Sequence, residues 1–256
     1  MTRILIIVFL IVFLSPVSEA QVASVAVNSR TMEELCESGK PSHKDLLLVR
    51  KPDYGFINGK DYYPYYFRSK RQPVLFADEK CNVTVNLNGK IYDDIAVQYD
   101  TFTDEVVFSD TENKFGLGQY MVALNKDNIN SFIFYYEDDT LIFINYNIST
   151  HPDFNLPGGF YETAYTGEIE YIIRHRSVVR KKDGIDEYFY SPLQYVKSKG
   201  GFIKFRTNKQ FIAIFDGRQN EMKKIVAKSG INVRHADKSR IIRLLKLYDA
   251  VCTGEK

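Results

Sequence analysis

The chain has 256 residues, of which 45% are hydrophobic, 14% aromatic and 26% charged, and its formal net charge is +2. A hydrophobic fraction of this size is typical of a folded globular chain, which excludes a largely disordered protein. The 18 Tyr and 18 Phe residues, with no Trp, favour the pleated, half-buried surfaces of β-sheets.

Residues 1–20 have the pattern of a secretory signal peptide. Arg3 precedes an unbroken apolar run of 11 residues, Ile4–Leu14, and small residues frame the exit at Ser18–Ala20. This run is shorter than the roughly 20 residues that a membrane-spanning helix needs, and no later segment is long enough. We therefore predict cleavage before Gln21, export to the periplasm, the extracellular space or the cell surface, and no transmembrane segment in the mature chain.

Three cysteines follow the predicted cleavage point, so they cannot all pair within one molecule. They show neither a CxxC motif nor a zinc-type spacing. A bridge between Cys36 and Cys81 is one alternative. Isolated thiols, including Cys252, are the other.

Residues 21–71 are weakly patterned, and we expect a partly ordered lead-in that is rich in aromatic residues from Tyr54 onward. Tyrosine rings stack on sugars or pack at protein interfaces, because each has an apolar body and a polar tip. Two interpretations stay open for this cluster, a binding surface or ordinary packing. The tyrosines proposed for binding are Tyr62, Tyr63, Tyr65 and Tyr66.

Residues 72–146 show the alternation of an antiparallel β region. Val83, Val85 and Leu87 alternate with polar residues before Asn88-Gly89, and this dipeptide beside alternating apolar residues is the strongest short-range signal of a hairpin. Several further short strands follow at even spacing. The pattern predicts a small antiparallel sandwich or a curled sheet.

Residues 147–159 interrupt the β pattern, because they contain Pro152, Pro157 and two glycines and few large apolar residues. We predict a linker or a long inter-domain loop at this position. Beyond it, residues 160–256 form a basic region that begins with two predicted hairpins. The first spans 160–179 and the second spans 188–205.

The C-terminal residues change to a helical period. Asn208 is predicted to cap a first short helix, Gly230 to end a second, and Asp237 to cap a third that runs to about Val251. The whole chain is therefore predicted as an α+β fold, with strands first and two or three C-terminal helices that close it.

Charge is divided unevenly along the chain. Residues 21–159 contain 13 Lys and Arg against 20 Asp and Glu, whereas residues 160–256 contain 20 against 11. This asymmetry indicates a basic half that binds an anion, two halves that neutralise each other, or solvated faces. No nucleic-acid recognition motif accompanies it, so we expect no nucleic-acid partner. The basic side chains proposed for an anionic ligand are Arg174, Arg176, Arg240, Arg243 and Lys246.

Catalytic signatures are not found in the sequence. No two of the four histidines lie four residues apart, and neither GxSxG nor a Walker loop occurs. His175 stands between two arginines and is predicted on a charged or edge strand. We predict no catalytic residue, no metal ligand and no cofactor. A carboxylate pair stays open, because it is defined by a distance in space that the sequence does not show.

Four segments resemble a widespread group of uncharacterised exported proteins of Bacteroidota: Val85–Tyr92, Val97–Val107, Gly159–Ile169 and Leu244–Asp249. Together they span roughly residues 72–251. The resemblance implies a Gram-negative envelope or extracellular setting, and it assigns no catalytic residue.

The sequence thus favours an exported, non-enzymatic protein that binds an envelope protein, a glycan or another anionic ligand. Two alternatives remain: a structural or scaffold subunit of an envelope assembly, and an envelope hydrolase that uses a carboxylate pair.

Overall fold

The computed structural model describes residues 57–65, 72–75, 82–109, 120–136, 139–147, 155–182 and 185–253. All of them belong to one compact unit, Gly55–Lys256. The predicted signal peptide and most of the lead-in, with Cys36, Cys81 and Tyr66, lie outside the described residues.

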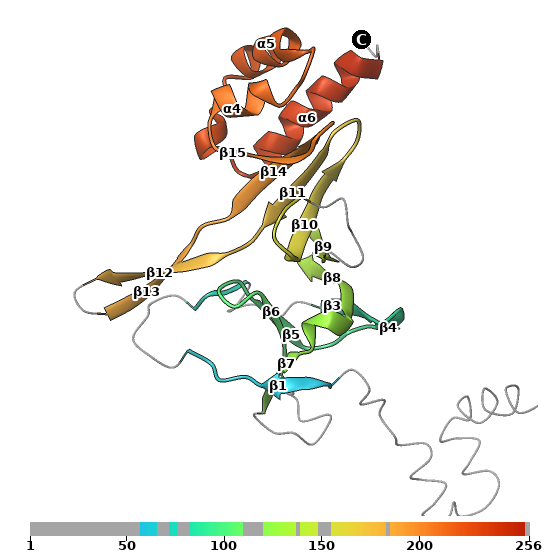
Figure 1. The fold of residues 1–256 in the computed structure, drawn as a ribbon, viewed down its shortest axis with the longest axis vertical. Coiled ribbons are helices and arrows are strands. Elements are labelled where there is room, and N and C mark those ends of the chain that lie inside the picture. Colours follow the sequence, from blue (N-terminus) through green and yellow to red (C-terminus); the bar gives the residue numbers. More distant parts are fainter. Residues whose placement is uncertain are drawn as a thin grey trace, which may run out of the picture. The chain divides into compact units, whose positions relative to one another are not determined.

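The α+β prediction is confirmed, because antiparallel strands are followed by three C-terminal helices (Figure 1). The first sheet has the order β1-β7-β6-β5-β2. The second has the order β15-β14-β11-β10-β9-β8-β3-β4, and β12 and β13 form a separate pair.

The strands of the first sheet are β1 (Gly59–Asp61), β2 (Val74–Leu75), β5 (Val97–Asp100), β6 (Glu105–Ser109) and β7 (Met121–Leu124). Those of the second sheet are β3 (Asn82–Leu87), β4 (Lys90–Tyr92), β8 (Ile129–Tyr136), β9 (Asp139–Tyr146), β10 (Gly159–Thr166), β11 (Glu170–Arg174), β14 (Leu193–Ser198) and β15 (Gly201–Phe205). The separate pair is β12 (Ser177–Lys182) and β13 (Ile185–Tyr190).

The hairpin predicted at Asn88-Gly89 is confirmed. It joins β3 to β4, with φ of 50° at Asn88 and 84° at Gly89. Two successive positive φ angles define a type I′ turn, whose twist matches that of the flanking strands. Asn and Gly tolerate this region of backbone space better than other residues do.

The first core lies between the two sheets, as in a sandwich, which is one of the two arrangements predicted from the sequence. The inward residues of β3 and β8, such as Val85 and Phe132, pack against Tyr99 and Phe108 of the first sheet, and all four are almost completely buried. The rings of Phe132 and Phe143 are stacked with centroids 4.6 Å apart. Burial of such aromatic side chains contributes about 2–3 kcal/mol each to stability.

A second core lies between the helices and β11, β14 and β15. Glu162 pairs in register with Phe143 on one side and with Ile173 on the other, so the three side chains share one face of the eight-stranded sheet. Phe143 belongs to the first core and Ile173 to the second. Both cores therefore cover the same face, and Glu162 lies at the boundary between them.

The C-terminal α-helices are α4 (Asn208–Ala213), α5 (Gln219–Ser229) and α6 (Lys238–Thr253). The predicted end at Gly230 is confirmed, with a left-handed φ of 65°, and Asp237 accepts from the backbone N–H of Arg240 at 2.9 Å as a cap should. The cap predicted for α4 is wrong. Thr207 holds that position, while the side chain of Asn208 accepts from the N–H of Val233.

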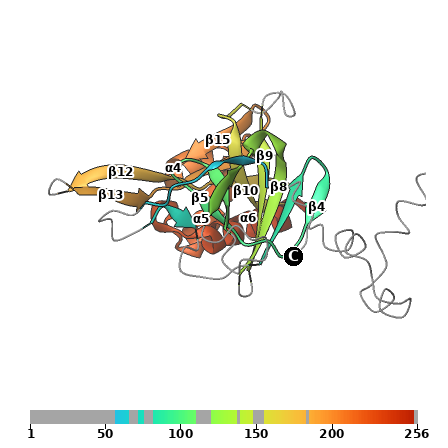
Figure 2. The same ribbon diagram turned by 90° about the horizontal axis from the view of Figure 1, so that it is seen from below.

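Two connections differ from the sequence prediction. Segment 147–159 joins β9 to β10, which pair within one sheet through Tyr146 and Gly159. It therefore connects neighbouring strands of a single compact unit. The predicted strands at 169–179 and 188–196 each divide in two, at His175-Arg176 and at Ser191-Pro192. The separated parts form the β12–β13 hairpin, which extends away from the other strands in both views (Figures 1 and 2).

Candidate ligand-binding site

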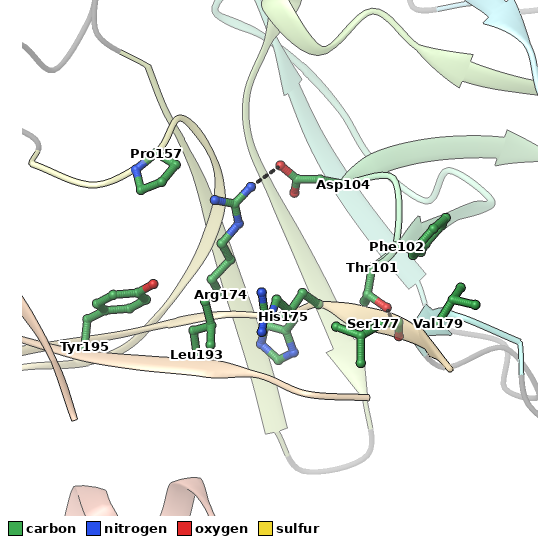
Figure 3. A pocket seen from close by; sticks show the side chains of 12 residues that line it. Thr101, Phe102, Asp104, Pro157, Arg174, His175, Ser177, Val179, Leu193 and Tyr195 are labelled. Carbon is green, nitrogen blue, oxygen red and sulfur yellow. Dashed lines mark hydrogen bonds and ion pairs between the residues drawn. The ribbon is translucent and has the colours of Figure 1, made fainter. Parts of the chain in front are cut away.

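A cavity of about 500 Å³ lies between the β5–β6 turn, the join from β11 to β12, and β14. Figure 3 shows Arg174 pointing across it to Asp104. Pro157 and Tyr195 lie on one side of Arg174, with Thr101 and Phe102 on the other. This volume is within the usual range of small-molecule sites.

The β5–β6 turn is held firmly at its first residue. The N–H and the hydroxyl of Thr101 both donate to the carbonyl of Pro73, at 2.8 and 2.7 Å. The hydroxyl of Thr101 then accepts from that of Ser177 at 2.8 Å, and the N–H of Ser177 donates to the carbonyl of Thr101 at 2.9 Å. The turn is thereby tied to Pro73, just before β2, and to β12.

Asp104 ends the turn with a left-handed φ of 60° and collects four donors. Its Oδ1 accepts from the hydroxyl of Tyr99 at 2.6 Å and from the N–H of Phe160 at 3.4 Å. Its Oδ2 pairs with the ammonium of Lys126 and with the guanidinium of Arg174, the latter at 3.4 Å. A carboxylate offers about four lone-pair positions, so Asp104 has none left for a ligand.

Gly159 leaves room for the ion pair between Asp104 and Arg174. Its φ is 147°, and a Cβ at this position would collide with Oδ2 of Asp104 and lie 3.1 Å from Nη2 of Arg174. Only glycine combines this backbone conformation with the close approach of both side chains.

Arg174 presents positive charge to the cavity. Its hydrogen bonds to Asp104 at 3.4 Å and to the hydroxyl of Tyr161 at 3.5 Å engage two of its five N–H groups. Burial alone would lower its pKa, but the charge of Asp104 raises the pKa above its ordinary value. Arg176 also lines the cavity, and its Nε donates to the carbonyl of Ser191.

The hydroxyl of Tyr195 adds a polar group to the wall. Burial raises its pKa, and the charges of Arg174 and Arg176 oppose that rise. Among the described residues that line the cavity, Asp104 is the single acidic one. With Asp104 already saturated, the cavity offers guanidinium groups to a ligand, and these bind carboxylate, sulfate or phosphate oxygens.

A buried polar cluster holds the β11–β12 join, and its central residue, His175, also lines the cavity. His175 donates or accepts at both ring nitrogens, with Glu162 Oε2 2.7 Å from Nε2 and the hydroxyl of Tyr190 2.6 Å from Nδ1. Lys238 of α6 donates to the other oxygen of Glu162 at 3.0 Å and to Asp139 at 2.6 Å. Glu162 is 2% exposed, so these bonds replace the water it loses.

Burial alone would raise the pKa of Glu162, but the hydrogen bond and charge of His175, together with Lys238, hold the pKa below its ordinary value. The cluster connects β10, β13 and α6 at a residue that stands between the two cavity arginines. It therefore fixes the backbone from which Arg174 and Arg176 extend.

The structure brings part of the predicted aromatic set to the same turn. Tyr62 and Tyr65 donate their hydroxyls to Asp100, at 2.9 and 2.7 Å, and the ring of Tyr65 contacts that of Phe102 at 6.3 Å between centroids. Tyr63 is 78% exposed. Tyr65 and the two arginines, predicted as separate features, thus lie around one turn.

The predicted basic residues of α6 are not part of the cavity wall. Arg240, Arg243 and Lys246 are exposed, and Arg240 has an ion pair with Asp237 at 3.8 Å.

Sequence reasoning missed Phe102, Asp104 and Glu162. No local pattern marks Asp104 as a partner of Arg174, which lies 70 residues away. The prediction for His175 gave no indication of its buried bond to Glu162. The one available signal was the β-turn at 100–105, where an Asp tolerates a left-handed backbone.

Comparisons with known proteins gave no match to a family model, to a curated protein or to a solved structure. Within the described residues, no group of three or more His, Cys, Asp or Glu is placed to hold a metal ion. None of the described helices has the length and apolar character needed to cross a membrane.

Proposed function

We propose that this chain is an exported, non-enzymatic binding protein of the periplasm or cell surface whose cavity takes a small anionic ligand. One observation carries the proposal: two arginines line a ligand-sized cavity whose acidic residue, Asp104, is already saturated by other donors. Charge-assisted hydrogen bonds from guanidinium groups are among the stronger polar contacts in proteins.

Export is supported by the basic start, apolar run and small-residue exit of residues 1–20. The resemblance to exported proteins of Bacteroidota supports a Gram-negative envelope setting.

The two alternatives from the sequence gain no comparable feature in the described residues. A glycosidase-type mechanism needs two carboxyl groups facing a common cleft, roughly 5–10 Å apart. The described wall of the cavity supplies only Asp104. No observation of comparable weight favours a scaffold subunit.

The test is titration calorimetry of the mature chain with acetate, glucuronate and inorganic phosphate at low ionic strength. Arg174→Met keeps the aliphatic stem but removes the guanidinium, so the affinity for the binding anions should fall roughly 30-fold or more. Arg243→Gln on α6 is the matched control, which removes a charge outside the cavity and should leave affinity within about twofold. Equal binding by wild type and Arg174→Met, or no binding of any anion by wild type, would overturn the proposal.

A further inference from the structure

The rim of the cavity carries an aromatic group on the same turn that holds the arginine. The ring of Phe102, a cavity-lining residue, has centroid distances of 6.3 Å to Tyr65 and 5.3 Å to Tyr188, and those two rings are 4.9 Å apart. Phe102 remains 44% exposed although it belongs to this three-ring group. A partly exposed ring at a cavity mouth is available to a ligand's apolar face.

A buried carboxylate fixes this aromatic group. Asp100 is fully buried, and its Oδ1 accepts from the N–H groups of Phe102 and Thr103 at 2.8 and 3.1 Å. Its Oδ2 accepts from the hydroxyls of Tyr62 and Tyr65. Burial, followed by the hydrogen bond and charge of Asp100, raises the pKa of Tyr65 well above its ordinary range, so this tyrosine stays a neutral donor.

One turn therefore presents two different recognition groups. Asp100, where β5 meets the turn, holds the backbone of Phe102, whose ring packs on Tyr65 and Tyr188, and Asp104 at the other end of the turn pairs with the guanidinium of Arg174. Groups fixed in advance lose little conformational entropy on binding, which favours affinity for a ligand that matches both.

The chemistry of such a ligand follows from the two groups. An acidic substituent pairs with guanidinium, and the C–H face of a saturated ring packs on an aromatic side chain. The hydroxyl of Tyr195, on the cavity wall, adds a hydrogen-bonding partner. A simple organic acid uses only the first group and a neutral sugar only the second. A sugar that carries an acid uses both.

We infer that the ligand is an acidic saccharide, with its acidic group at Arg174 and Arg176 and its sugar ring on Phe102. This inference rests on the proposed function, since it names the class of anion that the cavity takes. The acidic group is a carboxylate or a sulfate ester, which share the same guanidinium contacts.

The test compares four probes by titration calorimetry of the mature chain: glucuronate, glucose 6-sulfate, glucose and lactate. We expect at least one acidic sugar to bind 10-fold or more tightly than either lactate or glucose. Which acidic sugar binds more tightly identifies the acidic group.

Phe102→Leu keeps the apolar volume but removes the aromatic face. We expect it to weaken acidic-sugar binding by fivefold or more and to change lactate binding by much less. Phe102→Tyr keeps an aromatic ring and should bind the acidic sugar with wild-type affinity. This control separates loss of the ring from misfolding. Tyr135→Leu is the control, because Tyr135 is an exposed aromatic residue of β8 outside the cavity wall.

The outcomes separate this inference from the proposed function. Lactate that binds as tightly as both acidic sugars, with no effect of Phe102→Leu, would overturn the saccharide and leave an anion site in place. Failure of every anion to bind would remove both.

Discussion

Two regions of the molecule expose basic side chains, and the structure uses them differently. At the cavity, Arg174 is half-buried, held by Asp104 and placed near the ring of Tyr161 at 5.5 Å. On α6, Arg243 and Lys246 extend from a helix whose other face packs in the second core. A charge run in the sequence does not distinguish the two. Burial and a fixed partner distinguish them, because Asp104 orients the guanidinium of Arg174 at the cavity, whereas Arg243 and Lys246 are exposed on α6.

The largest effect is expected at Asp104, which holds the cavity arginine in place. Asp104→Ala removes the acceptor of Tyr99, Phe160, Lys126 and Arg174 together. We expect a loss of about 2–3 kcal/mol in the free energy of unfolding, since a partly buried charge pair loses one member. Urea unfolding measures it, and anion titration should show weaker binding in the same variant. Wild-type stability together with wild-type affinity would show that Asp104 does not organise the cavity.

The buried cluster around Glu162 and His175 gives a prediction for the pH dependence of stability. Because the pKa of Glu162 is lowered from 4.5 in the folded state, its contribution to stability is present above about pH 4.5 and is lost as the pH falls through the folded value. Glu162→Gln should lower the free energy of unfolding by about 2 kcal/mol at pH 7. Below pH 4.5 the free energy of unfolding of this variant should depend less on pH than that of wild type.

Urea unfolding of both proteins at pH 7, 4.5 and 3 tests this. A difference between the two that stays constant over the whole range would contradict the assigned role of Glu162.

At the other region, the cap of α6 supports the helix without reaching the cavity. Asp237→Ala removes the acceptor of the Arg240 N–H, so we expect about 1 kcal/mol of destabilisation. Thermal unfolding should report the loss, and anion affinity should remain that of wild type. A large fall in affinity would show that this cap is also needed to hold the cavity, through Lys238 of the same helix.

The smallest effect is expected for the double variant Arg243→Gln, Lys246→Gln. Both side chains are exposed, and substitutions at such positions usually change stability by less than about 0.5 kcal/mol. Calorimetry should give unchanged anion binding. Lost binding with intact folding would move the site to α6.

Local signals in the sequence predicted much of the fold. Asn88-Gly89, Gly230 and Asp237 each specify a turn or a helix end through their own backbone or side-chain chemistry. The cap of α4 failed for a tertiary reason, because the side chain of Asn208 bonds to Val233, 25 residues away, and Thr207 takes the capping role.

The site was less accessible to sequence reasoning. Arg174, Arg176 and Tyr65 were proposed from charge and composition, but nothing in the sequence placed them around one turn. Asp104 and Gly159 acquire their roles only when the β5–β6 turn lies against the start of β10. That contact depends on the packing of two sheets, which no short window of residues contains.

The most direct test of the anion site is an NMR titration of the mature chain, with ¹⁵N-labelled arginine side chains and glucuronate as the probe. We expect the Nε signals of Arg174 and Arg176 to shift along one saturating curve, while those of Arg240 and Arg243 stay in place. Saturating shifts at Arg240 and Arg243, with none at Arg174 and Arg176, would place the anion on α6 and contradict this expectation.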